Sequence, residues 1–597
     1  MPGGENRFVF GKILFVAVGV ALAAWLPARG RLERPVSIVL VCGLAILVLS
    51  ALVSAAPWVA VVGRAPRFEG LPMIGLYAGS AWAGARLLGS RPTAELTRVV
   101  VLMLAITAFA VALVAIVQVS GVQVLATDVF RPGSLLGNAD DEGALGVLAF
   151  GVCGWSAVRS LAPAAVIGLV SACVVIALSA SRAALVGLVV TALILFFNSP
   201  KRRVVLVAGG VVVVVVLMLA VPSSFARVTG SSPYAGVTAT GRVLLWQESA
   251  DLIGHHPVFG VGPDNFINGI TVEHDARWQS EIGPANPPDS PQDALLQAGA
   301  DGGLPLVMVA LFLVALVTRA GWRALRPGSP RAGTLAVGLF AAVAGYGVTL
   351  LFGLTTPGTT PLAAFCAGGV LALPCASATP SVGGSYDRLW PVSPEAFLRW
   401  SMVVACSVAA VAALLAAVAE IPLERGLVAV SHGDISAAQG DFHDAQALRP
   451  WDVSVAQTAG HAFAAEGSGL AAGSPAAVAV AHAGQPWLAQ AATHLRDDEE
   501  ERVDEATIDE LLGRDAPAAS LLRQALAVDP DNPAILLRLG VVEGESDQLS
   551  LAQSALLRTT RIDPNSIAAW NDLAIVYGLE HNSRAQARAE GRAKQLR

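Results

Sequence analysis

Residues 256–266 read His-Pro-Val-Phe-Gly-Val-Gly-Pro-Asp-Asn-Phe, between residues 241–248 (Gly-Arg-Val-Leu-Leu-Trp-Gln-Glu) and residues 285–297 (Ala-Asn-Pro-Pro-Asp-Ser-Pro-Gln-Asp-Ala-Leu-Leu-Gln). All three segments lie within residues 222–297, the longest polar break in an otherwise apolar first two-thirds of the chain. Between membrane spans, a polar loop of this length keeps irregular backbone hydrated beside whatever the spans enclose. We therefore expect membrane helices on both sides of this loop and functional residues within it.

The composition indicates an integral membrane protein with a soluble part attached. Of 597 residues, 54% are hydrophobic and 14% are charged, and the mean hydropathy is +0.61, whereas soluble domains carry about 25% charged residues. A net charge of -6 is slight for this length and predicts no nucleic-acid partner. The six cysteines lie in or beside apolar segments without a Cys-x-x-Cys pair, so we expect them to pack as small apolar side chains.

Apolar runs long enough to cross about 30 Å of hydrocarbon recur through residues 1–422. They number about twelve and fall near residues 9–26, 37–56, 71–89, 98–119, 142–158, 162–180, 183–198, 203–222, 293–318, 333–353, 357–375 and 400–420. The first run could instead be a cleaved signal peptide. That alternative is weaker, because cleavage would leave the basic linker at residues 29–34 outside the cell. We predict an all-α, polytopic membrane helix bundle.

The basic loops predict the orientation of this bundle. Lysines and arginines gather in alternate loops, near residues 29–34, 91–98, 201–203 and 319–331. Positively charged loops stay cytoplasmic. The loops at 57–70, 120–141 and 223–292 are therefore expected on the exoplasmic side, with everything after the last span. The short basic amino terminus would then lie outside as well, which a preceding span or one miscounted short helix would explain.

From residue 423 to residue 597 the chain is polar, rich in alanine and repetitive. Asp529-Pro530 and Asp563-Pro564 are 34 residues apart, which is the tetratricopeptide period. Small and apolar residues precede each proline at the same offsets: Ala518, Leu522 and Ala525, then Ala552, Leu556 and Thr559. We predict a second domain at 423–597, an exoplasmic α-solenoid of tetratricopeptide type. The concave surfaces of solenoids bind partners, so this domain is expected to recruit other proteins.

Three motifs occur in a recognisable order along the membrane part. Residues 131–138 read Arg-Pro-Gly-Ser-Leu-Leu-Gly-Asn, and residues 179–184 read Ser-Ala-Ser-Arg-Ala-Ala at a tight turn between two spans. The third motif combines Arg242 with Leu245-Trp246 and the segment 257–266. Together they resemble the O-antigen ligase and polymerase superfamily of bacterial membrane glycosyltransferases. The resemblance covers roughly residues 60–320, and appended tetratricopeptide repeats match a common layout of that family.

The resemblance implies transfer or polymerisation of a glycan at the outer face of the bacterial cytoplasmic membrane. The donor would be a polyprenyl diphosphate such as undecaprenyl diphosphate carrying the glycan, and neither metal nor another cofactor would be needed. By resemblance, Arg182 and Arg242 bind the diphosphate, which suits the planar fork of an arginine. The alternatives are that Arg182 is a helix-end arginine reaching for the membrane surface and that Arg242 is an exposed charge on an amphipathic helix.

Six further residues are candidates for substrate binding, each with a structural alternative. They are Arg67, Gly137, Asn138, Gly260, Gly262 and Asn265. Gly260 and Gly262 would permit a tight turn. Asn265 would pack the loop helices together, and Gly137-Asn138 would cap a re-entrant turn.

The chain departs from the family at the position of its histidine. The family typically shows a His-Asn pair before the next span, with the histidine proposed as the base or as the group that orients the acceptor. Here residues 290–297 read Ser-Pro-Gln-Asp-Ala-Leu-Leu-Gln. Gln292 cannot accept a proton, whereas Asp293 could serve as the catalytic base if burial raised its pKa. His274 and the pair at 255–256 are expected to be surface histidines.

Two other functions stay open. A transporter of lipid-linked glycans would carry ionisable residues or broken helices in two corresponding halves. A non-catalytic scaffold of a polysaccharide assembly system would use the repeats alone, and the missing histidine favours it.

Overall fold

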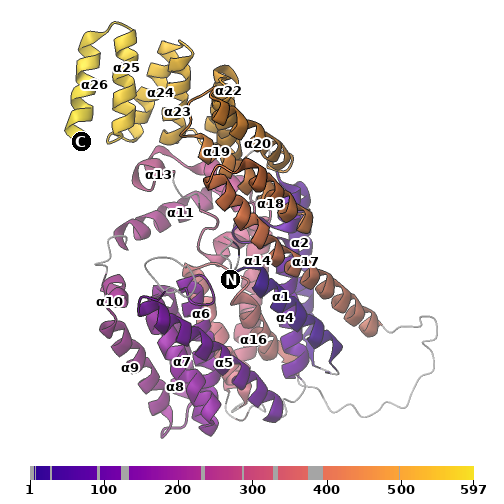
Figure 1. Cartoon of the computed structure of the whole chain (residues 1–597). Coiled ribbons are helices and arrows are strands. Elements are labelled where there is room, and N and C mark those ends of the chain that lie inside the picture. The colour runs from indigo at the N-terminus through magenta and orange to yellow at the C-terminus, as the bar shows by residue number, and fades with distance from the viewer. Residues whose placement is uncertain are drawn as a thin grey trace.

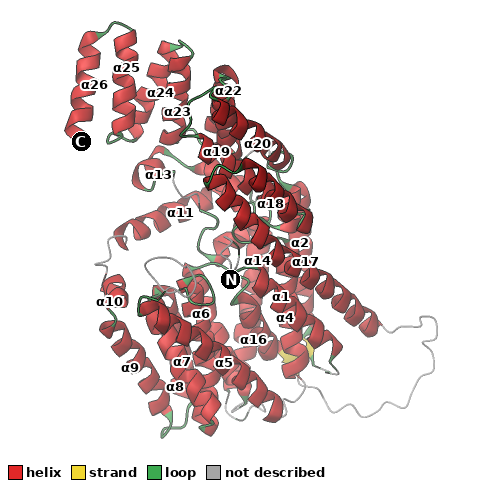
Figure 2. Ribbon diagram, in the orientation of Figure 1, coloured by secondary structure: helices red, strands yellow, loops and turns green. Residues whose placement is uncertain are grey.

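A computed structural model describes residues 6, 8–26, 28, 30–89, 94–122, 133–229, 235–284, 288–326, 328, 334–373, 394–495 and 498–597. Residues 131–132 of the first motif and 285–287 of the polar stretch lie outside this description. The predicted all-α class is confirmed, and among the described residues strands are confined to one short antiparallel pair (Figure 2). That pair joins β1 (Arg31–Leu32) to β2 (Ala372–Leu373), with Arg31 opposite Leu373.

Every one of the twelve apolar runs forms a helix. In chain order these helices are α1 (Phe10–Trp25), α2 (Arg34–Val53), α4 (Leu71–Gly89), α5 (Ala94–Val119), α6 (Ala139–Ser160), α7 (Pro163–Ser179), α8 (Arg182–Asn198), α9 (Val204–Ala220), α14 (Ala294–Leu325), α15 (Leu335–Thr349), α16 (Thr360–Leu371) and α17 (Pro394–Ser431). Among the described residues, six helices are long and apolar enough to cross a membrane, namely α2, α5, α6, α14, α15 with its extension to Phe352, and α17. A count of about twelve spans is therefore not confirmed, and several of the other apolar helices have only 12 to 17 residues.

Small residues let the membrane helices approach closely. Between α4 and α16, a Cβ added at Gly368 would lie 1.8 Å from the carbonyl oxygen of Ala81. A Cβ at Gly84 would lie 1.9 Å from the carbonyl oxygen of Phe365. Contact between glycine and backbone is how helices pack where lipid offers no hydrophobic driving force. The most enclosed of the helices is α6, whose side chains are buried among α5, α7, α8 and α15.

The polar stretch folds into a layer between the membrane helices and the solenoid (Figure 1). Its elements are α10 (Pro222–Thr229), α11 (Ala235–His255), α12 (Phe266–Ile270), the 3-10 helix η1 (Thr271–Glu273) and α13 (Ala276–Glu281). It has a small core of its own, formed by Leu244, Leu245, Leu252, Phe266, Ile270, Trp278 and Ala300. Ala300 belongs to α14, so this core joins the layer to a membrane helix.

One membrane helix is broken where the polar layer rests on it. Gly302 and Gly303 leave helical geometry inside α14, and Gly303 has φ +67°. The loop occupies the gap, since Leu304 N donates to the carbonyl of Pro257 at 2.8 Å. Val261 N likewise donates to the carbonyl of Ala300 at 2.7 Å. The loop backbone thus supplies hydrogen bonds that the interrupted helix lacks.

The carboxyl-terminal domain is a stack of helix pairs, of which the first is formed by α17 and α18. The helices after α17 are α18 (Ile435–Leu448), α19 (Val453–Gly467), α20 (Pro475–Ala491), α21 (Glu499–Leu511), α22 (Asp515–Val528), α23 (Pro533–Glu545), α24 (Leu549–Ile562), α25 (Ile567–Leu579) and α26 (Ser583–Leu596). The repeat residues singled out in the sequence (Ala518, Leu522, Ala525, Ala552, Leu556 and Thr559) are all buried between helices. The boundary expected at residues 422/423 falls inside α17, which runs from the membrane bundle into the solenoid without interruption and packs on α18.

A buried arginine joins the bundle to the solenoid. Arg449 is fully buried and pairs with Glu420 of α17 at 2.7 Å and with Asp452 at 3.3 Å. Its guanidinium also lies 5.1 Å from the ring centroid of Phe10. Among the described residues, Arg449 is the cation that pairs with both carboxylates.

Arg449→Met is expected to destabilise this junction by about 3–5 kcal/mol, because it leaves two buried carboxylates without a cation. Thermal unfolding of the purified protein, followed by tryptophan fluorescence, should show an earlier transition than in the wild type. Arg584→Met, at an exposed position of α26, is the matched control and should not move it. Equal unfolding temperatures for the two variants would contradict the role given to Arg449.

Candidate functional site

Arg242 and Gln292, which lie 50 residues apart in the sequence, meet in the structure. Arg242 is on α11, and its Nε donates to Oε1 of Gln292 at 3.1 Å. One turn further along α11, Trp246 Nε1 donates to the carbonyl of Pro291 at 3.1 Å. Because the two side chains are one helical turn apart, α11 contacts the segment before α14 at two points. Gln292 has φ +50°, so this segment turns sharply just before the helix.

A polar cavity of about 90 Å³ lies beside this contact. Its walls come from the starts of α6 and α8, the end of α15 and the segment that follows α15. They include Arg242, Gln292, Asn138, Asp140, Asp141, Ala183, Tyr346, Thr349, Thr356 and Thr359. Asp141 accepts hydrogen bonds from Thr356 Oγ1 at 2.5 Å and Thr359 Oγ1 at 2.6 Å. Lys12 Nζ lies 3.6 Å from the other oxygen of Asp141, so this carboxylate is held by donors on both sides.

Arg182 stands at the edge of this region. It is the first residue of α8, and Ser181 before it caps the helix by accepting from Ala184 N at 3.3 Å. The next residue, Ala183, lines the cavity, but the exposed guanidinium of Arg182 donates to the carbonyl of Arg227 at 2.7 Å. The two arginines of the predicted diphosphate site therefore lie on neighbouring elements, and one of them contributes to the cavity wall.

Asn138 lines the cavity and also caps α6, because its Oδ1 accepts from Asp140 N at 2.8 Å. Gly137 before it has φ +79°, and a Cβ there would lie 2.6 Å from the ring of Phe8. The pair is a helix-capping turn whose polar side chain faces the cavity. A contact with substrate by these two residues stays a prediction.

Gly260, Gly262 and Asn265 contact the protein rather than this cavity. At Gly260, with φ +65°, a Cβ would lie 2.2 Å from the carbonyl oxygen of Ala300. Gly262 has φ +102° and packs on Ser54. Asn265 Nδ2 donates to Ser54 Oγ at 2.8 Å. These residues seat the loop against the ends of α2 and α14, and substrate binding by them stays a prediction.

Asp293 caps α14. Its Oδ1 accepts from Leu295 N at 2.8 Å and from Leu296 N at 2.9 Å, so the carboxylate is committed to the first turn of the helix. The sequence predicts a catalytic role for Asp293, whereas these contacts favour a structural role as a helix cap, and one substitution distinguishes the two.

Asp293→Asn is expected to leave glycan transfer within about twofold of the wild type, because asparagine caps a helix about as well as aspartate. Asp293→Ala should cost about 1 kcal/mol of stability through loss of the cap. Thermal unfolding and transfer rates of both variants give the answer. An asparagine variant with wild-type stability and no transfer would instead make Asp293 the base.

Arg67 lies in a buried polar network on the other side of the α14 start. It pairs with Glu69 and donates to Gln297 Oε1 at 2.9 Å, to the carbonyl of Asp289 at 3.3 Å and to Thr355 Oγ1 at 3.3 Å. This network ties the loop at 63–70 to α14 and to the segment after α15. Substrate binding by Arg67 stays a prediction, because each of these contacts is internal.

Two buried carboxylates of this network have raised pKa values. Burial raises the pKa of Asp264 to about 6, although Arg67 and the backbone N–H of Arg64 favour its ionised form. Burial also raises the pKa of Glu69 against the opposing effect of Arg67. The sequence did not predict that these two acids are buried, because Asp264 stands in a polar loop segment between Pro263 and Asn265.

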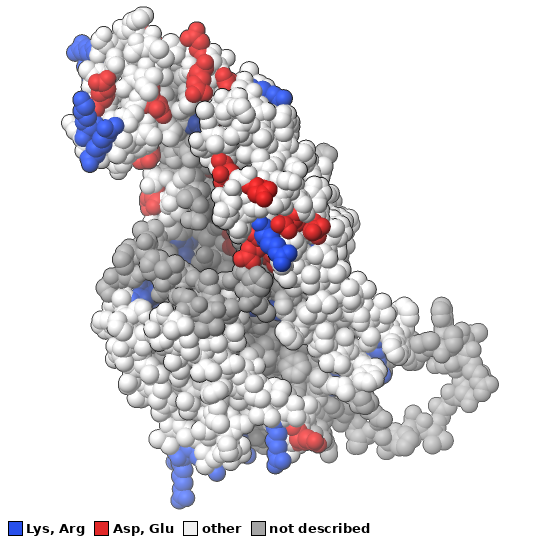
Figure 3. All heavy atoms as spheres, in the orientation of Figure 1, with Lys and Arg blue, Asp and Glu red and all other residues white. Residues whose placement is uncertain are grey.

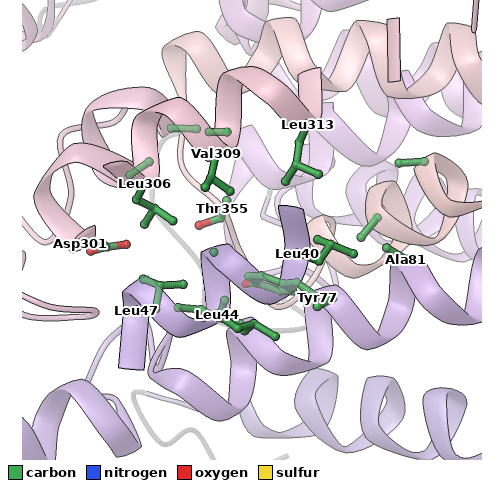
Figure 4. A pocket seen from close by; sticks show the side chains of 18 of the residues that line it. Leu40, Leu44, Leu47, Tyr77, Ala81, Asp301, Leu306, Val309, Leu313 and Thr355 are labelled. Carbon is green, nitrogen blue, oxygen red and sulfur yellow. The ribbon is translucent and has the colours of Figure 1, made fainter. Parts of the chain in front are cut away.

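An apolar pocket of about 370 Å³ opens between α2, α4, α14 and α16. Leu40, Leu44 and Leu47 of α2 face Leu306, Val309 and Leu313 of α14 across it (Figure 4). Glu69, Gln297, Asp301 and Thr355 give one end of the pocket a polar border. Thr355 lines this pocket, and its neighbours Leu354 and Thr356 line the polar cavity. The backbone of this one loop segment therefore lies between the apolar pocket and the polar cavity.

His274 was expected at the surface, and this expectation is wrong. It is only 6% exposed, its Nδ1 lies 2.7 Å from Glu248 Oε2, and its ring stacks on Trp278. The reason is that the solenoid covers the loop. His255 is exposed as expected and pairs with Glu273 at 2.7 Å. Within the described ranges, no group of three His, Cys, Asp or Glu side chains is placed to hold a metal ion.

Comparison with known proteins agrees with this architecture. Residues 165–311 match the O-antigen ligase family, and residues 516–574 match the tetratricopeptide repeat. The first match includes Arg182, Arg242, Gln292 and Asp293. The first match supports a glycan-transfer function at a membrane in general, and the second is of the kind used for protein interaction.

Solved structures resemble a part of the chain. The MamA protein is 15% identical over 30% of this chain and 91% of its own, with a TM-score of 0.26. YrrB, described as a TPR protein with an unusual peptide-binding site, is 13% identical over 29% of this chain and 82% of its own, with a TM-score of 0.24. No curated protein matched in the corresponding sequence comparison.

Proposed function

We propose that the protein transfers a glycan from a polyprenyl-diphosphate carrier to an acceptor at the outer face of a bacterial cytoplasmic membrane. The observation that carries this proposal is the polar cavity bordered by Arg242 and Gln292, separated by one backbone segment from a membrane pocket lined with leucines. A polyprenyl diphosphate has the same two parts, a charged head and a long branched apolar chain. Whether the reaction extends a polymer or attaches one is set by the acceptor.

The head of the carrier would bind at Arg242. Among the described residues only its Nε is engaged, by Gln292, so the terminal N–H groups of the guanidinium can pair with phosphate oxygens. Arg182 would reach the second phosphate by releasing the carbonyl of Arg227. Because a diphosphate is already an adequate leaving group, the protein has to hold it and stabilise the charge that develops on it. Neither role requires a metal ion.

The apolar chain of the carrier would lie in the pocket between α2 and α14. Burial of isoprenoid carbon among the leucines of this pocket contributes about 25 cal/mol for each Å² removed from water, which serves affinity rather than rate. Glu69 and Thr355 are polar, so the apolar part of the carrier lipid would end beside them and its diphosphate head would begin.

The acceptor hydroxyl has to lose a proton, and the cavity offers a carboxylate for it at Asp140 or Asp141. Asp141 accepts two hydroxyl hydrogen bonds at one oxygen, and its other oxygen lies near Lys12, so both oxygens are engaged within the protein. Asp140 also lines the cavity, on the first turn of α6, and we assign proton transfer to it. Asp140→Asn should lower the transfer rate about 100-fold with little change in carrier binding, as measured by initial rates and by a separate binding assay. A matching loss of binding would instead give Asp140 a structural role.

The charge distribution supports the proposed orientation. Lysine and arginine side chains project from the end of the helical bundle farthest from the solenoid (Figure 3). Positively charged ends face the cytoplasm, so the polar layer and the solenoid would face outward, where a flipped carrier presents its glycan.

Reconstitution tests the proposal. The purified protein is placed in proteoliposomes with undecaprenyl-diphosphate-linked oligosaccharide, which serves as donor and as acceptor, in buffer with a chelator and no nucleotide. Release of undecaprenyl diphosphate with formation of a longer or transferred glycan is expected. Binding of radiolabelled undecaprenyl diphosphate should be far stronger than binding of undecaprenol. Equal binding of the two lipids, together with no release, would overturn the proposal.

Transport of lipid-linked glycan is the second candidate. The break in α14 at Gly302–Gly303, beside Asp301, is the kind of discontinuous helix that transporters use. The same proteoliposomes separate the two functions, since a transporter moves the intact lipid across the bilayer without cleaving the bond to the sugar. A scaffold would do neither.

A further inference from the structure

A second polar pocket, of about 500 Å³, lies between the loop layer and the solenoid. One wall is formed by Arg64 and by α12, η1 and α13 of the loop layer, and the other by α21 and by the turn between α22 and α23. It is separate from the cavity beside Arg242, with which it shares no residue. The O-antigen ligase domain and the repeats thus jointly form a site that neither contains alone.

The pocket is rich in negative charge. Five carboxylates line it, those of Asp498, Glu499, Glu500, Asp504 and Asp529. The arginine of the pocket is already engaged, because Arg64 pairs with Asp498 at 2.8 Å, and the ring of His461 lies 2.9 Å from Asp504. Within the described residues, no lysine or arginine pairs with Glu499 or Asp529.

Burial and mutual repulsion of these acids have a measurable consequence. The pKa of Glu499 is raised to about 8, first by burial and then by the neighbouring Asp529 and Asp498. The pKa of Asp529 is raised to about 6, mainly by burial. A cation in the pocket would relieve both effects.

Three buried side chains that line this pocket have polar atoms without a hydrogen-bond partner among the described residues. In the described part of the chain, His274 Nε2, Gln279 Oε1 and Asp529 Oδ1 have no hydrogen-bond partner, and these residues are 6%, 4% and 1% exposed. His274 uses its Nδ1 for Glu248, and Gln279 uses its Nε2 for Asp529 Oδ2 at 2.7 Å. Buried acceptors without donors are costly, so a ligand rich in donors would stabilise the pocket.

One unpartnered donor lies among these acceptors. Nε of Arg64 has no partner among the described residues, since Nη1 of that guanidinium is turned to Asp498 and to Asn268 Oδ1 at 2.7 Å. A ligand that satisfies the whole pocket must therefore bring many donors and at least one acceptor. A peptide with a cationic side chain does so, because its backbone carbonyl can accept from Arg64.

We propose that this pocket binds an arginine side chain of an extended polypeptide segment from a protein partner. The guanidinium has five donors and no acceptor, and its fork matches carboxylates in two-bond geometry. Its aliphatic stem would lie along the apolar wall of Ile267, Val503 and Ile535. This recruitment site goes beyond the proposed transfer reaction and does not rest on it.

The test is a binding measurement with matched peptides. The purified full-length protein in detergent is titrated into a fluorescein-labelled heptapeptide, Gly-Ser-Arg-Gly-Arg-Ser-Gly, and into its twin with citrulline at both arginine positions. The citrulline side chain keeps the shape of arginine but is neutral. The arginine peptide is expected to bind at least tenfold more tightly, and its affinity should fall with added salt.

Substitutions locate the binding. Glu499→Gln and Asp529→Asn should each weaken the arginine peptide at least tenfold, whereas Glu590→Gln, at an exposed acid of α26, should not change its affinity. Unfolding temperatures of the variants show whether each one keeps the fold. If Asp529→Asn does not fold, the result with Glu499→Gln alone tests the proposal. Equal binding of the two peptides, or unchanged binding by a folded Glu499→Gln protein, would overturn the proposal. Binding of a chitosan tetramer or of calcium in place of the arginine peptide would overturn it too, in favour of an amino-sugar or a metal occupant.

Discussion

Alanine at position 242 is expected to lower the rate of glycan transfer by about 100-fold or more, because removal of a donor that stabilises developing charge typically costs 10² to 10³ in rate. The side chain sits on α11, is fixed by Gln292, and directs its remaining N–H groups into the region of the polar cavity. Binding of undecaprenyl diphosphate should weaken as well, since the same contacts hold the ground state. Initial rates and lipid binding, both in proteoliposomes, measure the two effects.

Two further variants make this result specific. Arg242→Lys keeps the charge but loses the fork, so an intermediate rate is expected. Arg277→Ala removes an exposed arginine of α13, which pairs with Glu281 at 3.0 Å, and should leave transfer unchanged. If the alanine variant at position 242 turned over at the wild-type rate, Arg242 would have no part in holding the diphosphate.

Arg67→Met is expected to destabilise the fold by about 3–5 kcal/mol, because one buried cation then no longer faces the carboxylates of Glu69, Asp264 and Asp301. Thermal unfolding in detergent should shift strongly downward. Arg202→Met, in an exposed loop, serves as the control and should not shift it.

The loss caused by Arg67→Met should depend on pH in a definite direction. The pKa of Asp264 is raised in the folded protein to about 6, above its usual value, and that of Glu69 is raised as well. An acid whose pKa is higher in the folded state binds more protons there, so stability falls as pH rises through this interval. The variant should therefore be more stable at pH 5 than at pH 8. Wild-type stability with reduced transfer would instead support the predicted role of Arg67 in substrate binding.

Much of the architecture follows from local pattern. The twelve apolar runs all form helices, because a long apolar stretch in lipid must satisfy its backbone internally. The 34-residue spacing of two Asp-Pro pairs predicted the repeats, since small residues at fixed offsets are what lets paired helices stack. The number of membrane crossings was harder to predict, because several apolar helices are short.

The site was predicted only in pieces. Arg242 and Gln292 were both singled out, but nothing in the sequence indicated that they touch. Asp141 belongs to none of the three sequence motifs. It lines the cavity because the first turn of α6 lies at the cavity wall. His274 reads as a loop histidine until the solenoid is placed over it.

The sequence by itself determined that this chain is a bundle of apolar helices with a polar loop and a repeat domain, because hydrophobicity and helix propensity are local and periodic. Only the tertiary structure decided that Arg242 borders a polar cavity, that Arg67 is buried among carboxylates, and that loop and solenoid enclose an acidic pocket. Burial, pKa values and side-chain partners depend on segments separated by 50 to several hundred residues. Those contacts exist only after the helices have packed.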